Sequence, residues 1–405
     1  MTTTIIIAVC VLLLIAYVFD LTSGKTKIPS VILLLALGWL VKQGSELSGI
    51  HVPDLSALLP IFGTIGLILI VLEGALELEL DQSKRPLIGK AVLVSLLPML
   101  MLAGALAAAF TYACHCSWRL ALLNAVPLCV ISSAIAIPSV RGLPGSQKEF
   151  IIYESSLSDI FGVLFFNFMA VNEYINAASF GHFAMELVVI AIISFTVTTG
   201  LALLLKKIDH HIKFGPIIVL VILIYAIAKV YHLPGLIVIL FFGLFLGNLD
   251  KLSNFKWVAR LQLNAFDQEV HKFREITVEA AFLIRALFFL LFGFHIQTAE
   301  LLDLHTLIWA IGIVAGILAI RFIALKATRL PAQPLVFIAP RGLITILLFL
   351  SIAPEQSIPL VNRPLVIQII VLSAIVMAAG LMTNRKPADT PMPLPVPDTM
   401  VPTEE

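Results

Sequence analysis

Long apolar segments alternate with short polar connections along almost the whole chain. A helix needs about 20 mainly apolar residues to cross the hydrocarbon core of a bilayer. The pattern predicts thirteen such spans: Thr4–Leu21, Ile28–Val41, Leu55–Leu76, Leu87–Tyr112, Arg119–Val140, Phe150–Val171, Phe183–Leu205, Phe214–Val230, Leu233–Leu249, Thr277–Ile296, Thr306–Lys326, Leu335–Ile352 and Leu365–Leu381. The expected fold is therefore an all-α polytopic membrane protein.

The first apolar segment has an alternative interpretation as a signal peptide. However, Met1–Thr4 carries no Lys or Arg, and no small-x-small cleavage pattern follows the apolar run. Signal peptides usually have both features. We therefore expect an uncleaved first helix.

Basic residues orient the spans, because connections on the cytoplasmic side are enriched in Lys and Arg. Of the 26 basic residues, 19 fall in odd-numbered connections and the C-terminal tail, 4 in even-numbered connections and 3 inside spans. This asymmetry supports the count of thirteen spans. It predicts a multi-pass protein of the cell (inner) membrane, with its N-terminus outside and its C-terminus in the cytoplasm.

Two segments lie outside the spans. Residues Asp250–Glu275 mix charges with apolar residues at helical spacing, which predicts an amphipathic cytoplasmic helix. Residues 384–405 are rich in Pro and carry no apolar pattern, so we expect a disordered cytoplasmic tail. Residues 1–383 then form one transmembrane domain.

Composition narrows the functional classes. Hydrophobic residues make up 60% of the chain and charged residues 13%, with a mean hydropathy of +1.04. A soluble domain has about 25% charged residues, so a soluble enzyme is excluded. The net charge of +1 offers no basic excess for nucleic acid. Four cysteines form no disulfide framework, and no motif calls for a cofactor or for a metal beyond a transported cation.

The fifth and twelfth spans are the most interrupted by polar or helix-breaking residues. The interrupting residues are Ser132, Ser133, Pro138, Pro340, Arg341 and Gly342. Pro138 removes a helical hydrogen bond and clashes with the carbonyl of Ala134, so we expect the fifth span to kink there. The fifth and twelfth spans are seven apart, so they cross the bilayer in opposite directions. Two inverted halves, about 1–172 and 214–383 joined by the seventh span, would require this arrangement. Two broken helices at matching positions are typical of a transport site.

Charged groups inside spans are costly, so each needs a reason. Asp159 lies near the middle of the sixth span, with Ser155 one turn earlier on the same face and Glu154 and Ser158 on the neighbouring face. Loss of water favours the neutral form of a carboxylic acid, so such a group can exchange a proton for a cation. Alternatively, Asp159 is a neutral structural hydrogen-bonding group. Arg321 lies near the cytoplasmic end of its span and is expected to extend to water.

These motifs resemble those of the monovalent cation:proton antiporter superfamily. Glu154-x-x-x-x-Asp159 is similar to the Glu-x-x-x-Asn-Asp signature of its electroneutral sodium/proton branch. The segment Glu73–Leu78 is similar to the end of the third span in that superfamily. The motifs of its two crossing helices resemble Ser132-Ser133 and Pro340-Arg341-Gly342. Ser158 stands where the family has Asn, and Ser132-Ser133 stand where it has Thr-Asp. One acid of the family pattern is therefore absent.

The resemblance implies roles for these residues. Asp159 would bind the ion and the proton. The further ion ligands would be Ser155, Glu73, Ser132, Ser133 and Ser158. The crossing helices would contain Pro138, Pro340, Arg341 and Gly342. Arg341 would offset excess negative helix dipole. Glu154 would form a structural ion pair with Arg285, and the protein would be a homodimer in the lipid bilayer.

We therefore expect a secondary active antiporter that exchanges Na⁺ or K⁺ for H⁺ without net charge movement and serves pH homeostasis. One alternative is a sodium-coupled organic-anion symporter, in which Arg341 and the serines bind a carboxylate. A second is a membrane-embedded enzyme using Ser132 or Ser133 with His115 or His295, but no Gly-x-Ser-x-Gly or His-Glu-x-x-His motif supports it. A third is a structural subunit of a larger complex.

Overall fold

The computed structural model describes residues 2–26, 28–49, 55–78, 84–140, 142–174, 176–207, 214–230, 235–248 and 267–383. Its elements are α1 (Thr2–Thr26), α2 (Ser30–Leu47), α3 (Leu58–Glu77), α4 (Arg85–Cys114), α5 (Trp118–Cys129), α6 (Ser133–Ser139), α7 (Gly145–Val171), α8 (Ala177–Lys207), α9 (Phe214–Val230), α10 (Gly235–Gly247), α13 (Asp267–Phe294), α14 (Thr298–Leu301), α15 (Leu304–Ala327), the 3-10 turn η3 (Leu335–Phe337), α16 (Leu343–Leu350), the 3-10 turn η4 (Pro354–Gln356) and α17 (Arg363–Thr383).

The expected all-α fold is confirmed. Within the described residues, nine stretches are long and apolar enough to cross a membrane, α5 and α6 together forming one of them. Part of α8, together with α9 and α10, forms shorter apolar helices, and the segment with η3 and α16 occupies the place of the predicted twelfth span. Most of the predicted amphipathic helix, up to residue 266, and the whole predicted tail lie outside the described residues.

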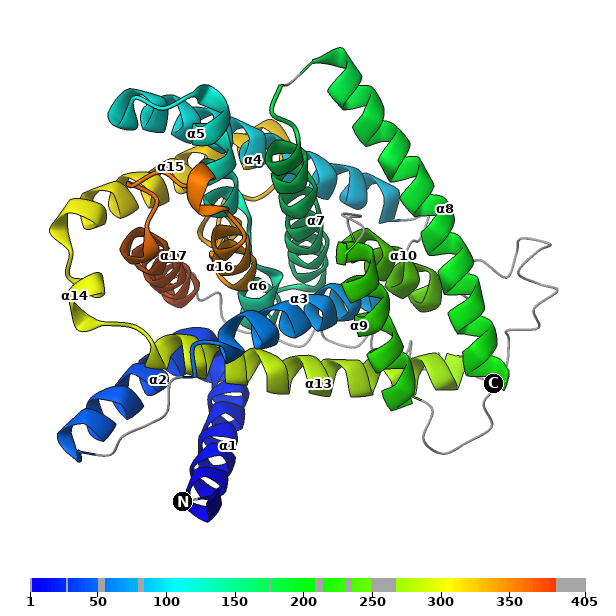
Figure 1. Cartoon of the computed structure of the whole chain (residues 1–405), viewed down its shortest axis with the longest axis horizontal. Helices are drawn as coiled ribbons and strands as arrows, with labels where there is room; N and C mark the ends of the chain where they lie inside the picture. Colours follow the sequence, from blue (N-terminus) through cyan, green and yellow to red (C-terminus); the bar gives the residue numbers. More distant parts are fainter. Residues whose placement is uncertain are drawn as a thin grey trace, which may run out of the picture.

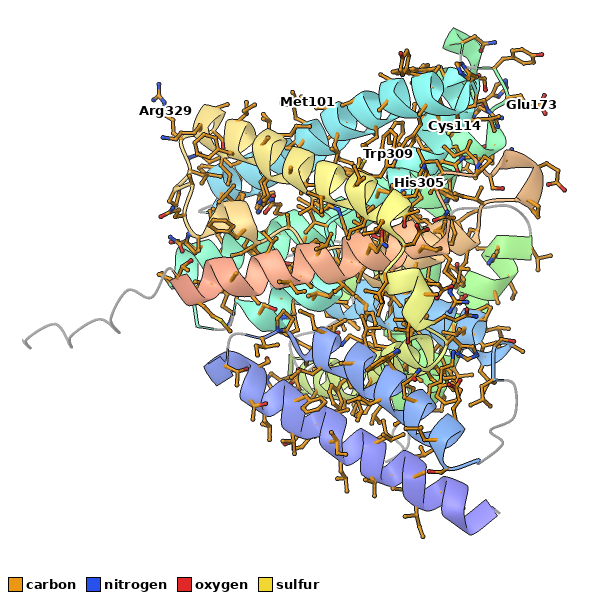
Figure 2. All side chains as sticks on the ribbon, turned by 90° about the vertical axis from the view of Figure 1, so that its left-hand side faces the viewer. Met101, Cys114, Glu173, His305, Trp309 and Arg329 are labelled. Carbon is orange, nitrogen blue, oxygen red and sulfur yellow. The ribbon has the colours of Figure 1, made fainter. Side chains whose placement is uncertain are left out.

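The helices pack as two bundles (Figure 1). The first bundle contains α4 to α7 and α15 to α17, and the second contains α1 to α3, α8 to α10 and α13. In the first bundle, α4 and α15 lie side by side, and the rings of Phe110 and Trp309 have centroids 6.0 Å apart (Figure 2). Contacts of α3 with α16, α6 and α7, and of α1 with α6, join the two bundles.

Glycines allow very close helix contacts in the second bundle. A Cβ on Gly38 of α2 would lie 2.2 Å from the carbonyl oxygen of Leu290, and one on Gly293 of α13 would lie 2.3 Å from that of Leu35. Small residues let transmembrane helices approach until their backbones touch, which supplies packing that lipid cannot. This contact fixes α13, the helix that contains Arg285, against α2.

A buried ion pair joins α7 to α15 in the first bundle, and it corrects the expected partner of Glu154. Both carboxylate oxygens of Glu154 accept from Arg321, at 2.5 and 2.8 Å, whereas the resemblance implied Arg285. The Nε of Arg321 donates to the carbonyl of Leu335 at 2.7 Å. The two side chains are only 3% and 1% exposed. The expectation that Arg321 extends to water is also wrong, because α4 and α17 cover this helix and acceptors inside the bundle satisfy its guanidinium.

Removing one member of the Glu154–Arg321 pair should destabilise the protein more than removing both. Glu154→Gln strands a buried guanidinium and Arg321→Met strands a buried carboxylate, so each should lower the free energy of unfolding by about 3–5 kcal/mol. The double variant should melt at a higher temperature than either single variant in detergent, measured by differential scanning fluorimetry.

The matched control is Lys84→Gln, which breaks the Lys84–Glu149 pair, whose side chains are 24% and 42% exposed. Exposed pairs contribute about 0–1 kcal/mol, so this change should hardly move the melting temperature. Wild-type melting temperatures for both buried single variants would contradict the structural role of the pair.

Candidate functional site

The fifth span is broken between α5 and α6, over Val130–Ser132. Val130 and Ser132 have extended backbone angles, with φ of −80° and −81° and ψ of 129° and 114°. A Cβ on Gly162 of α7 would lie 2.3 Å from a methyl carbon of Val130, so this glycine lets α7 approach the break. The expected kink at Pro138 is wrong in position, because Pro138 lies inside α6, after the break.

Neighbouring segments bond three consecutive backbone N–H groups at this break. The donors and acceptors are Ile131 N to Ser158 Oγ at 2.9 Å, Ser132 N to the carbonyl of Pro340 at 2.9 Å, and Ser133 N to Asp159 Oδ2 at 3.4 Å. The Ser133 hydroxyl also donates to Asp159 Oδ2. These acceptors explain why the chain leaves the helix here rather than at Pro138.

The twelfth span is extended between η3 and α16, and Arg341 lies in this break. Its Nε donates to the carbonyl of Leu128 at 2.7 Å, its Nη1 to that of Ala339 at 2.9 Å, and its backbone N–H to Ser373 Oγ at 3.0 Å. Leu128 lies in the last turn of α5, so the guanidinium occupies the negative end of that helix dipole. A Cβ on Gly342 would lie 2.7 Å from Ser132 Oγ, so the two breaks touch.

Asp159 lies at this crossing and has one carboxylate oxygen left over. Its side chain is 3% exposed, Oδ2 accepts from Ser133, and Oδ1 has no hydrogen-bond partner among the described residues. The hydroxyl of Ser132 is also buried there and has no hydrogen-bond partner in the described part of the chain. A buried oxygen without a hydrogen-bond partner lowers the stability of the fold, and such an oxygen can bind a proton or a small cation.

The remaining candidate ligands have different surroundings. The Ser158 hydroxyl accepts from Ile131 N at the break of the fifth span. The Ser155 hydroxyl donates to the carbonyl of Ile151 at 2.7 Å within α7. The structure therefore brings Asp159, Ser132, Ser133 and Ser158 together. Glu73 lines the same cavity as Ser133.

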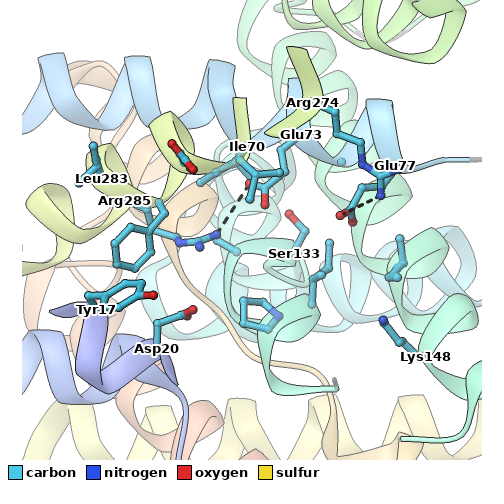
Figure 3. A pocket seen from close by; sticks show the side chains of 18 of the residues that line it. Tyr17, Asp20, Ile70, Glu73, Glu77, Ser133, Lys148, Arg274, Leu283 and Arg285 are labelled. Carbon is cyan, nitrogen blue, oxygen red and sulfur yellow. Dashed lines mark hydrogen bonds and ion pairs between the residues drawn. The ribbon is translucent and has the colours of Figure 1, made fainter. Parts of the chain in front are cut away.

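A cavity of about 1050 Å³ lies between the two bundles and reaches the crossing. It is lined by residues of α1, α3, α6, α7 and α13, and Ser133 lies in its wall (Figure 3). Asp159 is not among the lining residues, so Ser133 separates this carboxylate from the cavity. An ion entering from the cavity would meet Ser133 first and Asp159 next.

Two ion pairs between α3 and α13 line the same cavity (Figure 3). Arg285 Nη1 lies 3.9 Å from Glu73 Oε2, and Arg274 Nη2 lies 3.3 Å from Glu77 Oε1. Sequence reasoning missed that Arg285 faces Glu73 and that Arg321 is a buried partner. The available signal was that Glu154 and Arg321 carry opposite charges and lie four and five residues from the cytoplasmic ends of their predicted spans, and therefore at a similar depth.

A family model described as the sodium/hydrogen exchanger, transmembrane, matches residues 9–385. No curated protein matches the chain. Two structures of the sodium proton antiporter MjNhaP1 from Methanocaldococcus jannaschii have a similar fold. The one at pH 8 has a TM-score of 0.68 and 19% identity, covering 94% of this chain and 98% of that one.

The second structure, from electron microscopy, has a TM-score of 0.66 and 18% identity and covers 95% of each chain. The similarity in fold extends over nearly the whole molecule, and the resemblance drawn from the sequence motifs is confirmed. Because the family model spans all but the ends of the sequence, the chain belongs to the sodium/hydrogen exchanger family of transmembrane proteins.

Proposed function

We propose that the protein exchanges a monovalent cation, Na⁺ or K⁺, for one proton, and that both bind in turn at Asp159. The observation that carries the proposal is the buried Asp159 carboxylate at the crossing of two broken segments, with one oxygen unpartnered among the described residues. Ser133, whose hydroxyl donates to this carboxylate, lies in the cavity wall. Membership of the sodium/hydrogen exchanger family supports the same chemistry.

Competition for one carboxylate couples the two fluxes. When Asp159 is ionised, its free oxygen and the Ser132 hydroxyl are available to a cation; when it is protonated, the cation has no charge to bind. The cavity lies between the two bundles, so movement of one bundle against the other would close it and open the opposite side.

The organic-anion symporter has less support. Arg341, which would have to bind the organic carboxylate, donates Nε and Nη1 to backbone carbonyls at 2.7 and 2.9 Å. Its charge is therefore used to hold the crossing together. The family is one of transporters, which gives no support to the enzyme or structural-subunit hypotheses.

The orientation is also part of the proposal. Arg329, expected in the cytoplasm, and Glu173, expected outside, lie at opposite ends of the first bundle (Figure 2). With the asymmetry of basic residues, this supports an inner-membrane protein with an external N-terminus and a cytoplasmic C-terminus. The proposed assembly is the homodimer that the resemblance implies.

Asp159→Asn should fold but lose all exchange. An amide oxygen can still accept from Ser133, so the crossing is kept, but the charge that binds a cation or proton is gone. The measurement is cation-dependent dequenching of a pH-sensitive dye in proteoliposomes, with Na⁺, K⁺ and Li⁺ tested in turn.

The control for this variant is Asp303→Asn, which changes a carboxylate at the start of α15 outside the cavity and should retain exchange. Retained cation-dependent proton flux in correctly folded Asp159→Asn would rule out Asp159 as the shared site.

Exchange should be insensitive to membrane potential. One carboxylate neutralised alternately by H⁺ or by a cation carries the same net charge in both directions. A potential contributes about 2.3 kcal/mol per moved charge per 100 mV, and here no net charge moves. The test imposes a potential on proteoliposomes with a gradient of the permeant anion thiocyanate, at equal Na⁺, K⁺ and pH on both sides. Proton movement driven by the potential alone would contradict a one-for-one exchange.

A further inference from the structure

The connection between α13 and α15 joins the two bundles at the end of the molecule that is expected outside. Residues 295–303 leave the second bundle at the end of α13 and enter the first bundle at α15, with α14 between them. Figure 1 shows α14 between α17 of the first bundle and α2 of the second. Its hydrogen bonds to both sides therefore affect how firmly the bundles are held together here.

A buried glutamine of α17 attaches this connection to the first bundle. Nε2 of Gln368 donates to the three carbonyls of Glu300, Leu301 and Asp303, at 3.2, 3.4 and 3.0 Å. Gln368 is only 3% exposed, so water cannot replace these acceptors easily. The connection from residue 300 onwards is therefore expected to move with the first bundle.

Arg363, the first residue of α17, reaches from the first bundle to the second. Its Nη2 donates to the carbonyl of His295, the residue after α13, at 2.5 Å, and its Nε lies 3.4 Å from Oε1 of Glu300. Oε2 of Glu300 accepts from the backbone N–H of Gln297 at 2.9 Å. Glu300 thus holds the guanidinium in place, and the guanidinium binds at the negative end of the α13 dipole.

Two side chains of α2 bind the same connection from the second bundle. Nε1 of Trp39 donates to Oγ1 of Thr298 at 3.2 Å, and Nζ of Lys42 donates to the carbonyl of Ile296 at 3.5 Å. Movement of the first bundle against the second would strain these bonds and the bond from Arg363 to His295.

All of these bonds lie on the closed side of the molecule. The cavity between the bundles is lined by Lys84, Lys148 and Arg274, which belong to connections expected in the cytoplasm. In the outer half, α3 and α16 touch, because a Cβ on Gly63 would lie 2.5 Å from a methyl carbon of Leu347. The cavity therefore opens at the expected cytoplasmic end.

We propose that Arg363, held by Glu300, is an outer lock that stabilises the arrangement open to the cytoplasm and is released when the site opens outward. This inference rests on the proposed function, of which alternating access is a part. Water reaches the lock, because the side chain of Arg363 is 40% exposed, so its release strands no buried charge. Exposed charge pairs contribute little to stability, and such a contact biases an equilibrium without fixing it.

The Glu154–Arg321 pair shows the contrast. It lies inside the first bundle, and its side chains are 3% and 1% exposed. Movement between the bundles leaves that pair intact, whereas it has to break the bond from Arg363 to His295.

The test measures access to the closed side with an introduced cysteine. The four native cysteines are replaced by alanine, and Leu347→Cys is added on the face of α16 that touches α3. A membrane-impermeant methanethiosulfonate is applied from outside. Leu347 is 8% exposed, so labelling should be slow while the lock is intact. Arg363→Gln should label about five- to tenfold faster, the shift expected from losing one exposed charged hydrogen bond.

Two further variants test whether the effect belongs to the lock. Arg363→Lys keeps a cationic donor for the carbonyl of His295 and should label nearly as slowly as the unmodified lock. Trp39→Phe keeps the ring but removes its bond to Thr298, so it should speed labelling in the same direction as Arg363→Gln.

A second reporter distinguishes opening from general loosening. Ile137→Cys lies in the cavity wall and is labelled from the cytoplasmic side in inverted vesicles. Arg363→Gln should not speed this labelling, because fewer molecules are open to the cytoplasm. Faster labelling at both reporters would mean a loosened protein and would overturn the lock.

Arg119→Gln is the matched control, because Arg119 also binds carbonyls at the end of a helix but stays within the first bundle. Its guanidinium donates at 2.6, 3.1 and 3.2 Å to carbonyls in the last residues of α7 and just after it. This variant should lower the melting temperature and leave the labelling of Leu347→Cys unchanged. An unchanged rate in Arg363→Gln, or an equal increase in Arg119→Gln, would overturn the inference.

The sidedness of Na⁺ affinity covers the case in which Leu347→Cys does not fold. The apparent dissociation constant on each side is divided by the fraction of molecules open to that side. In Arg363→Gln with its native cysteines, half-saturating Na⁺ outside should therefore fall relative to that inside by about five- to tenfold. Right-side-out and inverted vesicles give the two values, and an unchanged ratio would overturn the lock.

The outcomes also separate this inference from the proposed function, because labelling requires no transport. Exchange by Asp159→Asn would contradict the proposed function and leave the labelling result standing. Exchange that depends on Asp159, together with unchanged labelling and sidedness in Arg363→Gln, would contradict only the outer lock.

Discussion

Backbone N–H groups that leave a helix inside a membrane-spanning segment must find acceptors in protein, because lipid offers none. Three such groups follow one another at Ile131, Ser132 and Ser133, and their acceptors lie in α7 and in the twelfth span. This requirement brings the two broken segments together and holds α7 beside them. The absence of side chains at Gly162 and Gly342 makes the contact close enough.

The same bonds create the site. Asp159 uses one carboxylate oxygen to hold Ser133 and keeps the other free of hydrogen bonds among the described residues. A carboxylate that had both oxygens bonded would be a structural residue, and one in open water would bind a cation weakly. Its position behind Ser133, one residue from the cavity wall, makes it reachable without being solvated.

Three arginines inside the spans have three different environments, and the difference follows from what surrounds each guanidinium. Arg341 is held by carbonyls at the end of α5 and in its own break, Arg321 by a buried carboxylate and a carbonyl, and Arg285 by a carboxylate in the cavity. Each charge is expensive in a bilayer, and each has a partner that lowers the cost. Of these partners, only the carboxylate of Glu73, beside Arg285, lines the cavity between the bundles.

The sequence by itself was sufficient for the all-α fold, the two interrupted spans and the family, because the length of apolar segments and short motifs are local properties. Asp159 could be singled out for the same reason, as a carboxylate deep in an apolar span. The partners of Glu154 and Arg285, and the position of the break before Pro138, depend on distances between helices far apart in the chain. Periodicity and motifs contain no information about which side chains of different helices face each other, so only the tertiary structure decided that Arg321 neutralises Glu154 and that Arg285 faces Glu73.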